Sequence, residues 1–220
     1  MRFENKYTDI SICKHQIYLT KVLKTIIIKK ERWEMFGMHK NVLGLSLFCE
    51  EILYISKLFY NGNSLEMIEE RIHALYSPQK SRVLYERIAF LKYDFVSEIK
   101  TEQNLVLKYI CFYLIMRTDK CLMSFLHFIY HEYLLLYDVH LERNQLLRFL
   151  LGETTGSLKK LERQCDLYIK LLLEAEIIVK QGNQFIWEKH YFDILDEKMI
   201  RHSTNNFFKN LVLGEQLICG

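Results

Sequence analysis

“LLLEAEIIVKQGNQFIW” (Leu171–Trp187) changes its hydrophobic period halfway along. Up to about Glu176, the apolar residues follow the spacing of an amphipathic helix. From Ile177 onward the stretch is typical of two short strands, and the Gly182-Asn183 pair between them suits the tight turn of a two-residue β-hairpin. The stretch therefore predicts a long helix that runs directly into a hairpin.

The segment before this long helix predicts a second, shorter one. “HLERNQLLRFLLGE” ends near Gly152, and a Thr-Thr-Gly turn then leads to Ser157, a good N-cap residue for the long helix. The order helix, turn, helix, hairpin is the second half of a winged helix-turn-helix, and we expect its earlier helix to come from the chain before Asp138. The hairpin is either a wing that lies against nucleic acid or a structural flap that closes a small domain.

The rest of the chain favours helices. Half of the 220 residues are hydrophobic, and there are only one proline and eight glycines to break helices. The helix in “SLFCEEILYISKLFY” is expected to end before Gly62, Asn63 or Ser64 can cap the next helix, and Pro78 separates that helix from a third. We predict an all-α protein, with a helical bundle as its N-terminal part and a C-terminal winged-helix-like part containing one short β-hairpin.

The predicted organisation has a basic N-terminal extension (1–44), a helical domain (45–137) and a winged-helix-like domain with C-terminal helices (138–220). The most apolar stretch, Leu105–Tyr137, is interrupted by charged residues at short intervals. Because a spanning helix needs about 20 apolar residues in a row, we interpret this stretch as two buried helices broken near Thr118. We expect no membrane span.

Positive charge is concentrated at the start of the chain. Residues 1–44 carry a balance of +5 and the remaining residues −2, within a total of +3. Such a basic segment is typical of contact with an anionic partner, and equally of a solvated helix face. Its amphipathic stretch suits packing on the body of the protein better than a membrane surface.

The long helix before the hairpin has a basic outer face. On a helical wheel, its apolar residues cover a third to a half of the circle, and Lys159, Arg163 and Lys170 line up on the far side. Lysine and arginine in such a position neutralise phosphates, and glutamine or arginine can contact base edges. The candidate DNA-binding residues, on the helix and at the hairpin tip, are Lys159, Lys160, Arg163, Gln164, Lys170, Lys180 and Gln181.

An alternative interpretation of this helix is a plain solvated face. Glu162, Asp166 and Glu174 dilute its positive charge, and any amphipathic helix of a soluble protein has a charged outer side. Winged-helix domains also serve as protein-interaction modules. A docking role without nucleic acid is therefore the competing hypothesis.

Sequence patterns for catalysis are absent. The chain contains no phosphate-binding glycine-rich loop, no dinucleotide fingerprint, no nucleophile elbow and no H-E-x-x-H sequence. His127 and His131 lack an evident third metal ligand and fit core histidines better, and the six scattered cysteines fit reduced, buried thiols. We expect no enzyme activity, no catalytic residue, no bound metal and no cofactor.

A dense group of charged and aromatic residues lies on the third predicted helix. It consists of Arg82, Tyr85, Glu86 and Arg87, and Glu86 is placed to pair with Arg82 one turn away. We interpret the group as intrahelical pairing.

Taken in order, these segments resemble the BrxA family, small accessory proteins of bacterial BREX phage-defence systems. The likeness covers roughly Leu45 to Ile200. “EEILYISKLFYNGNSLEMIEERI” resembles the opening helix pair of that family, and “SRVLYERIAFL” its following helix. “SFLHFIYHEYLLLYDVHLERNQLLRFL” resembles its middle part, and “LKKLERQCDLYIKLLLEAEII” the helix that ends in a turn. The chain differs from the pattern in its N-terminal extension and in Glu176, where a glycine is typical.

The resemblance implies an all-helical cytosolic protein whose winged-helix-like part binds DNA in support of a multi-protein defence system. It names no catalytic residues. We therefore expect a non-enzymatic, cytoplasmic subunit with double-stranded DNA and other BREX subunits as partners. The alternatives are a protein-interaction scaffold with no nucleic-acid role, and RNA binding by the helical N-terminal part.

Overall fold

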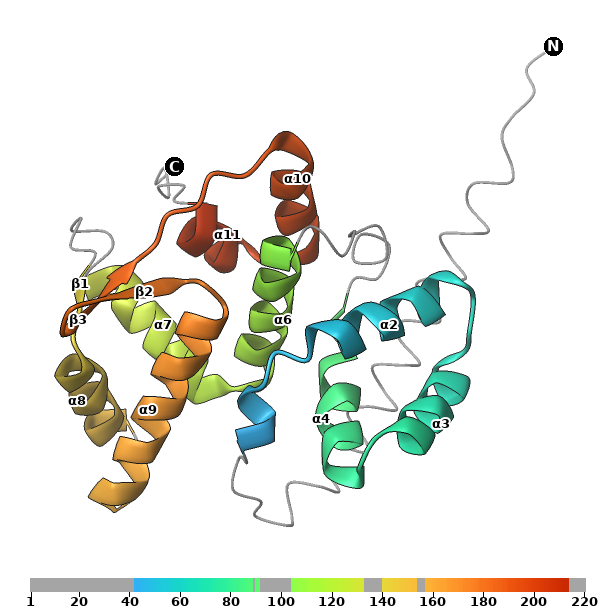
Figure 1. Cartoon of the computed structure of the whole chain (residues 1–220), viewed down its shortest axis with the longest axis horizontal. Coiled ribbons are helices and arrows are strands. Elements are labelled where there is room, and N and C mark those ends of the chain that lie inside the picture. The colour runs from blue at the N-terminus through green and yellow to red at the C-terminus, as the bar shows by residue number, and fades with distance from the viewer. Residues whose placement is uncertain (1–41, 89, 92–103, 133–139, 154–156, 214–220) are drawn as a thin grey trace. The chain divides into compact units, whose positions relative to one another are not determined.

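The computed structural model describes residues 42–88, 90–91, 104–132, 140–153 and 157–213 (Figure 1). The chain divides into two compact units, Met1–Lys40 and Asn41–Gly220, and all described residues belong to the second. Most of the predicted basic extension (1–44) lies outside the described residues. So does the predicted domain boundary between residues 137 and 138, which stays a prediction.

Helices predominate among the described residues, and the strands form one small sheet. In chain order the elements are η1 (Val42–Leu45), α2 (Cys49–Tyr60), α3 (Leu65–Leu75), α4 (Pro78–Ile88), α6 (Asn104–Thr118), α7 (Lys120–Glu132), β1 (His140–Leu141), α8 (Arg143–Glu153), α9 (Leu158–Glu174), β2 (Ile178–Gln181), β3 (Gln184–Trp187), α10 (Ile194–Ser203) and α11 (Asn206–Leu213). The predicted fold class, mostly helical with a short hairpin, is confirmed.

Local signals place the ends of α2 and α3 where the sequence predicts them. After α2, Gly62 has a φ of 77°, a left-handed conformation that glycine adopts without strain. Ser64 is the N-cap of α3, because its Oγ accepts a hydrogen bond of 3.3 Å from the backbone N–H of Met67. The other candidate cap, Asn63, instead donates its side-chain amide to the carbonyl of Leu58 at 2.8 Å.

The apolar stretch predicted as two helices forms α6 and α7, which are separated only by Asp119. α6 is buried along most of its length, because it packs against α2, α4, α7 and α10 (Figure 1). Among the described residues, no helix combines the length and the apolar character that crossing a bilayer requires.

The sheet has three antiparallel strands in the order β1-β3-β2, where the sequence predicted only the hairpin. The hairpin turns at the predicted Gly182-Asn183 pair, and Lys180 lies opposite Phe185. The additional strand β1 pairs His140 with Ile186 and Leu141 with Phe185. It was missed because two residues carry no readable alternation.

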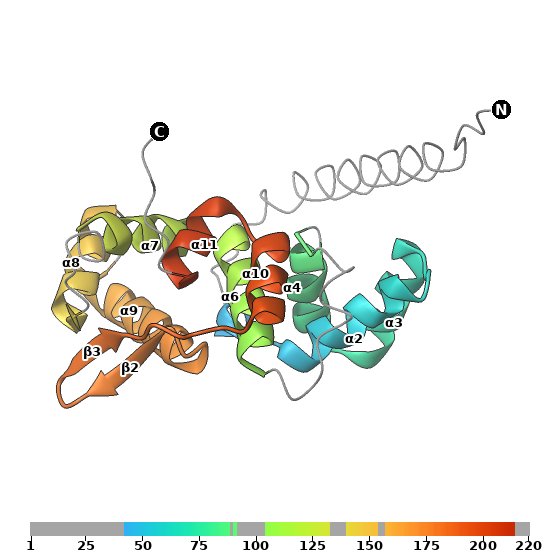
Figure 2. The ribbon, with the colours of Figure 1, turned by 90° about the horizontal axis from the view of Figure 1, so that it is seen from above.

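The additional strand completes the order of a winged helix: α7, β1, α8, α9, β2, β3. α7 packs against α8, α8 against α9, and α9 against β2, so the hairpin of β2 and β3 lies beside α9 (Figure 2). α9 therefore takes the place of the second helix in the predicted helix-turn-helix order, and its contact with DNA stays a prediction.

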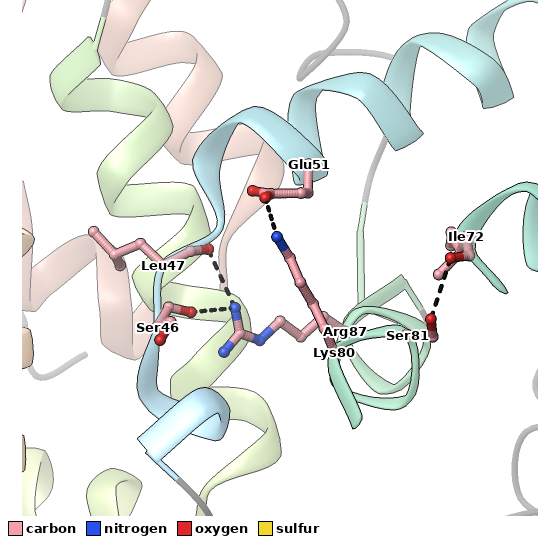
Figure 3. Close-up of polar contacts among 7 residues, drawn as sticks. All are labelled: Ser46, Leu47, Glu51, Ile72, Lys80, Ser81 and Arg87. Atoms are coloured by element: carbon pink, nitrogen blue, oxygen red, sulfur yellow. Dashed lines mark hydrogen bonds and ion pairs between the residues drawn. The ribbon is translucent and has the colours of Figure 1, made fainter. Parts of the chain in front are cut away.

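Arg87, a member of the charged and aromatic group on the third predicted helix, is fully buried. Its guanidinium donates hydrogen bonds to the carbonyls of Gly44 (2.9 Å), Ser46 (2.6 Å) and Leu47 (3.2 Å), of which the last two appear in Figure 3. Burial lowers the pKa of Arg87 to about 10, so the group remains charged at neutral pH. Arg87 thus fixes the chain between η1 and α2, and η1 in turn contacts α9.

Two ion pairs also stabilise these helices. Lys80 of α4 pairs with Glu51 of α2 (Figure 3). Within α4, the Nε of Arg82 lies 3.1 Å from Oε1 of Glu86, so the predicted pairing of these two residues is confirmed.

Candidate nucleic-acid interface

The outer face of α9 carries a stripe of exposed cations. Lys159, Arg163 and Lys170 are all exposed, and their spacing places them within about 40° of one another around the helix axis. Because each residue rises about 1.5 Å, the stripe extends about 16 Å along the helix. The opposite face packs into the core through residues that include Leu161, Cys165, Tyr168, Ile169 and Leu172.

The three cations of this stripe have no carboxylate partner among the described residues. Asp166, which lies between Arg163 and Lys170, is bound elsewhere: its Oδ1 accepts a hydrogen bond of 2.7 Å from Nε of Arg143, at the start of α8. The hydrogen bond from Arg143 also raises the pKa of that arginine. Asp166 therefore dilutes the positive charge of the stripe less than the sequence suggested.

Lys160 and Gln164 lie off this stripe. Lys160 is exposed, whereas Gln164 is half-buried and donates its side-chain amide to the hydroxyl of Tyr168 at 3.0 Å. This hydrogen bond draws the amide of Gln164 toward the inner edge of α9. Its predicted contact with bases stays a prediction.

A buried network lies behind Gln164. The hydroxyl of Tyr168 donates to Oδ1 of Asp119 at 3.2 Å, and the same oxygen accepts the backbone N–H of Leu122 at 3.1 Å, which caps α7. Burial, followed by the nearby Asp119, raises the pKa of Tyr168, so its phenol keeps the proton that it donates. The network ties α9 to the junction of α6 and α7.

Only one of the two side chains that form this network, Asp119, could be predicted from the sequence. An aspartate directly before an apolar helix is a readable N-cap, so Asp119 was open to prediction. Tyr168 looked like one apolar residue among others, and its partner is separated from it by 49 positions.

The predicted wing residues, Lys180 and Gln181, are exposed at the end of β2. The turn that leads into the hairpin is made at Glu176, whose φ of 57° lies in the left-handed region that favours glycine. The carboxylate of Glu176 pairs with Lys108 of α6, and its carbonyl accepts a hydrogen bond of 2.9 Å from Nε2 of His190. The hairpin base is therefore anchored on both sides, while the tip projects into solvent.

The described residues offer no alternative metal centre, since no group of three or more His, Cys, Asp or Glu is placed to hold an ion. His127 is half-buried and stacks on Phe207, with ring centroids 3.7 Å apart. Burial and the neighbouring His131 lower the pKa of His127. His131 itself is exposed, so the interpretation of both as core histidines was wrong for that residue.

The described cysteines are free thiols. Cys111 and Cys165 are buried, as predicted, whereas Cys49 and Cys121 are partly exposed. Cys13 and Cys219 lie outside the described residues.

Comparison with known proteins does not extend this interface. No family model matches the chain, and no curated protein or solved structure does so. The resemblance to the BrxA family stays a prediction, and the arrangement of the residues themselves carries the functional argument.

Proposed function

We propose that this protein is a non-enzymatic, double-stranded-DNA-binding accessory subunit of a BREX-type phage-defence system that acts in the cytoplasm. One observation carries the DNA part of the proposal: Lys159, Arg163 and Lys170 form an exposed stripe without carboxylate partners on the second helix of a helix-turn-helix pair. The BREX part, with other BREX subunits as partners, rests on the sequence resemblance alone.

In this proposal α9 enters the major groove, which is wide enough to admit a helix. Lys159, Arg163 and Lys170 neutralise phosphates, and Lys180 and Gln181 of the wing contact the backbone beside an adjacent groove. Such contacts are independent of sequence and weaken as salt rises, because each neutralised phosphate releases counterions. The three phosphate contacts of α9 alone imply an affinity loss of about 40-fold between roughly 50 and 200 mM salt.

The experiment is a fluorescence-anisotropy titration on a random-sequence duplex at both salt concentrations. The test variant is Lys159→Glu/Arg163→Glu, and the matched control is Lys57→Glu/Arg71→Glu, because these two cations are exposed on α2 and α3. Both variants change the net charge equally. We expect the test variant to weaken binding by at least about 30-fold and the control by no more than about 3-fold, since phosphate contacts act locally.

Two results would contradict the proposal. A wild-type protein that ignores DNA at low salt would remove the DNA-binding function. Equal weakening by the test and control variants would show that only the overall charge matters, and not the outer face of α9. Circular dichroism of each variant checks that it is folded.

A second candidate function is the interaction scaffold, which an exposed apolar group at the start of α10 favours. Tyr191, Ile194 and Leu195 are 92%, 88% and 50% exposed, and adjacent apolar residues with this exposure are typical of a partner surface. Co-expression with BREX subunits tests it. If wild type ignores DNA but retains a subunit that Ile194→Asp loses, the scaffold function is the better account.

A further inference from the structure

Asp166 lies in the middle of the cationic stripe of α9. It follows Arg163 by three residues and precedes Lys170 by four, so both cations are within reach along the helix. An acidic residue four positions before a lysine is the favourable orientation for an intrahelical pair. The local sequence therefore predicts that Asp166 neutralises part of the stripe.

The structure directs Asp166 to a different partner. Its Oδ1 accepts the hydrogen bond from Nε of Arg143 at 2.7 Å, and Asp166 makes no other hydrogen bond or ion pair among the described residues. The two side chains come from different helices, because Arg143 begins α8 and Asp166 lies in α9. The ion pair thus removes the carboxylate from the cations of its own helix.

The backbone of Arg143 is held beside Asp166 by a separate contact. The thiol of Cys165 donates to the carbonyl of Arg143, with sulfur and oxygen 3.7 Å apart. Burial raises the pKa of Cys165 to about 11, so the thiol keeps its proton at neutral pH. Because α8 and α9 pack together, the arginine reaches the carboxylate from a fixed position.

We propose that Arg143 is a positioning residue for DNA binding, which holds Asp166 at α8 and leaves Arg163 and Lys170 available for phosphates. The proposal rests on the proposed function above. Arg143 itself need not contact DNA, since its effect is to keep a competing carboxylate away from the stripe. Without it, Asp166 turns to Lys170 or Arg163 and weakens the phosphate contacts.

The test is a double-mutant cycle on DNA affinity at low salt, with wild type, Arg143→Gln, Asp166→Asn and the double variant. Arg148→Gln is the matched control, because Arg148 is an exposed arginine of the same helix and its loss changes the net charge equally. We expect Arg143→Gln to weaken binding by about 5-fold in the wild-type background. In the Asp166→Asn background it should have an effect below about 1.5-fold, since no carboxylate remains to be released.

The control should behave additively. Arg148→Gln is expected to cost the same in the wild-type and Asp166→Asn backgrounds. If Arg143→Gln also costs the same in both, Arg143 contacts DNA directly or contributes only its charge, and the proposal is overturned. If the double variant recovers the DNA affinity that Arg143→Gln loses, a merely structural role of Arg143 is excluded.

Failure of this proposal is distinguishable from failure of DNA binding itself. If the wild-type protein does not bind DNA, both proposals fail. If it binds DNA but the cycle is additive, only the proposed role of Arg143 fails. If Arg143→Gln does not fold by circular dichroism, Arg143→Lys replaces it. That variant keeps the charge but lacks the planar guanidinium, so we expect a cost of about 2-fold that disappears with Asp166→Asn.

Discussion

The helical part around α2–α4 and the winged-helix part around α7–α9 each bury one charged side chain, and the two have opposite charge. Arg87 is fully buried and Asp119 is nearly so. Among the described residues, Arg87 has no carboxylate partner, and its guanidinium bonds to the backbone carbonyls of Gly44 in η1 and of Ser46 and Leu47 between η1 and α2. Asp119 binds the backbone N–H of Leu122 and the hydroxyl of Tyr168.

The difference follows from what each group can do with hydrogen bonds. A guanidinium has several donors fixed in one plane, so it can order a chain segment that has no regular structure of its own. A carboxylate only accepts, and here it orients a phenol, which in turn receives the amide of Gln164. Arg87 thus holds a segment of backbone in place, whereas Asp119 orients the side chain of Tyr168 on α9.

Breaking the Arg87 contacts should have the largest effect. Arg87→Met leaves the carbonyls of Gly44, Ser46 and Leu47 without their donors in a mostly dry environment, and we expect a loss of about 3 kcal/mol in the free energy of unfolding. Urea unfolding measures it. Arg71→Met, at an exposed arginine of α3, is the control and should change stability by less than about 0.5 kcal/mol. A similar small change for Arg87→Met would show that the buried guanidinium contributes no net stability.

Breaking the Asp119 contacts through Tyr168 should cost less. Tyr168→Phe keeps the ring but removes the hydroxyl that donates to Asp119, so we expect a loss of about 2 kcal/mol, the scale of a hydrogen bond to a charged group. Tyr191→Phe is the control, since that hydroxyl belongs to a side chain that is 92% exposed. Equal urea midpoints for the two variants would argue that Asp119 finds a replacement donor.

A rise in pH should lower the free energy of unfolding through Tyr168, by a smaller amount than either substitution. Burial raises the pKa of Tyr168 in the folded protein, whereas an unfolded tyrosine ionises near pH 10. The stability contributed by the protonated phenol is therefore complete below about pH 10 and is lost as pH rises beyond it. At about pH 11 the loss is about 1.4 kcal/mol for each tyrosine that stays protonated only in the folded state.

Unfolding measured at pH 8 and at pH 11 checks this prediction. Tyr168→Phe should show a smaller alkaline loss than wild type. Arg87→Met should show a larger loss than wild type, because the pKa of Arg87 is lower in the folded protein than in the unfolded chain and its deprotonation offsets part of the wild-type loss. If Tyr168→Phe keeps the full pH dependence, ionisation of the other tyrosines accounts for it.

The sequence predicted those features that depend on neighbours along the chain. Gly62 and Ser64 mark helix ends through their own backbone and side-chain chemistry, and the Gly182-Asn183 turn determines the hairpin register. The exposure of Lys159 and Lys170 follows from helical periodicity in the same way. These signals lie within a few residues, so they are readable before folding.

By itself, then, the sequence determined the helices, the hairpin and the cationic face of α9. Only the tertiary structure decided that His140 and Leu141 join β3, that Arg87 turns inward, and that Asp166 pairs with Arg143 instead of Lys170. In each case the deciding partner lies more than 20 positions away. Periodicity reports which side of an element is apolar, but a hydrogen-bond partner from another element exists only once the two have packed.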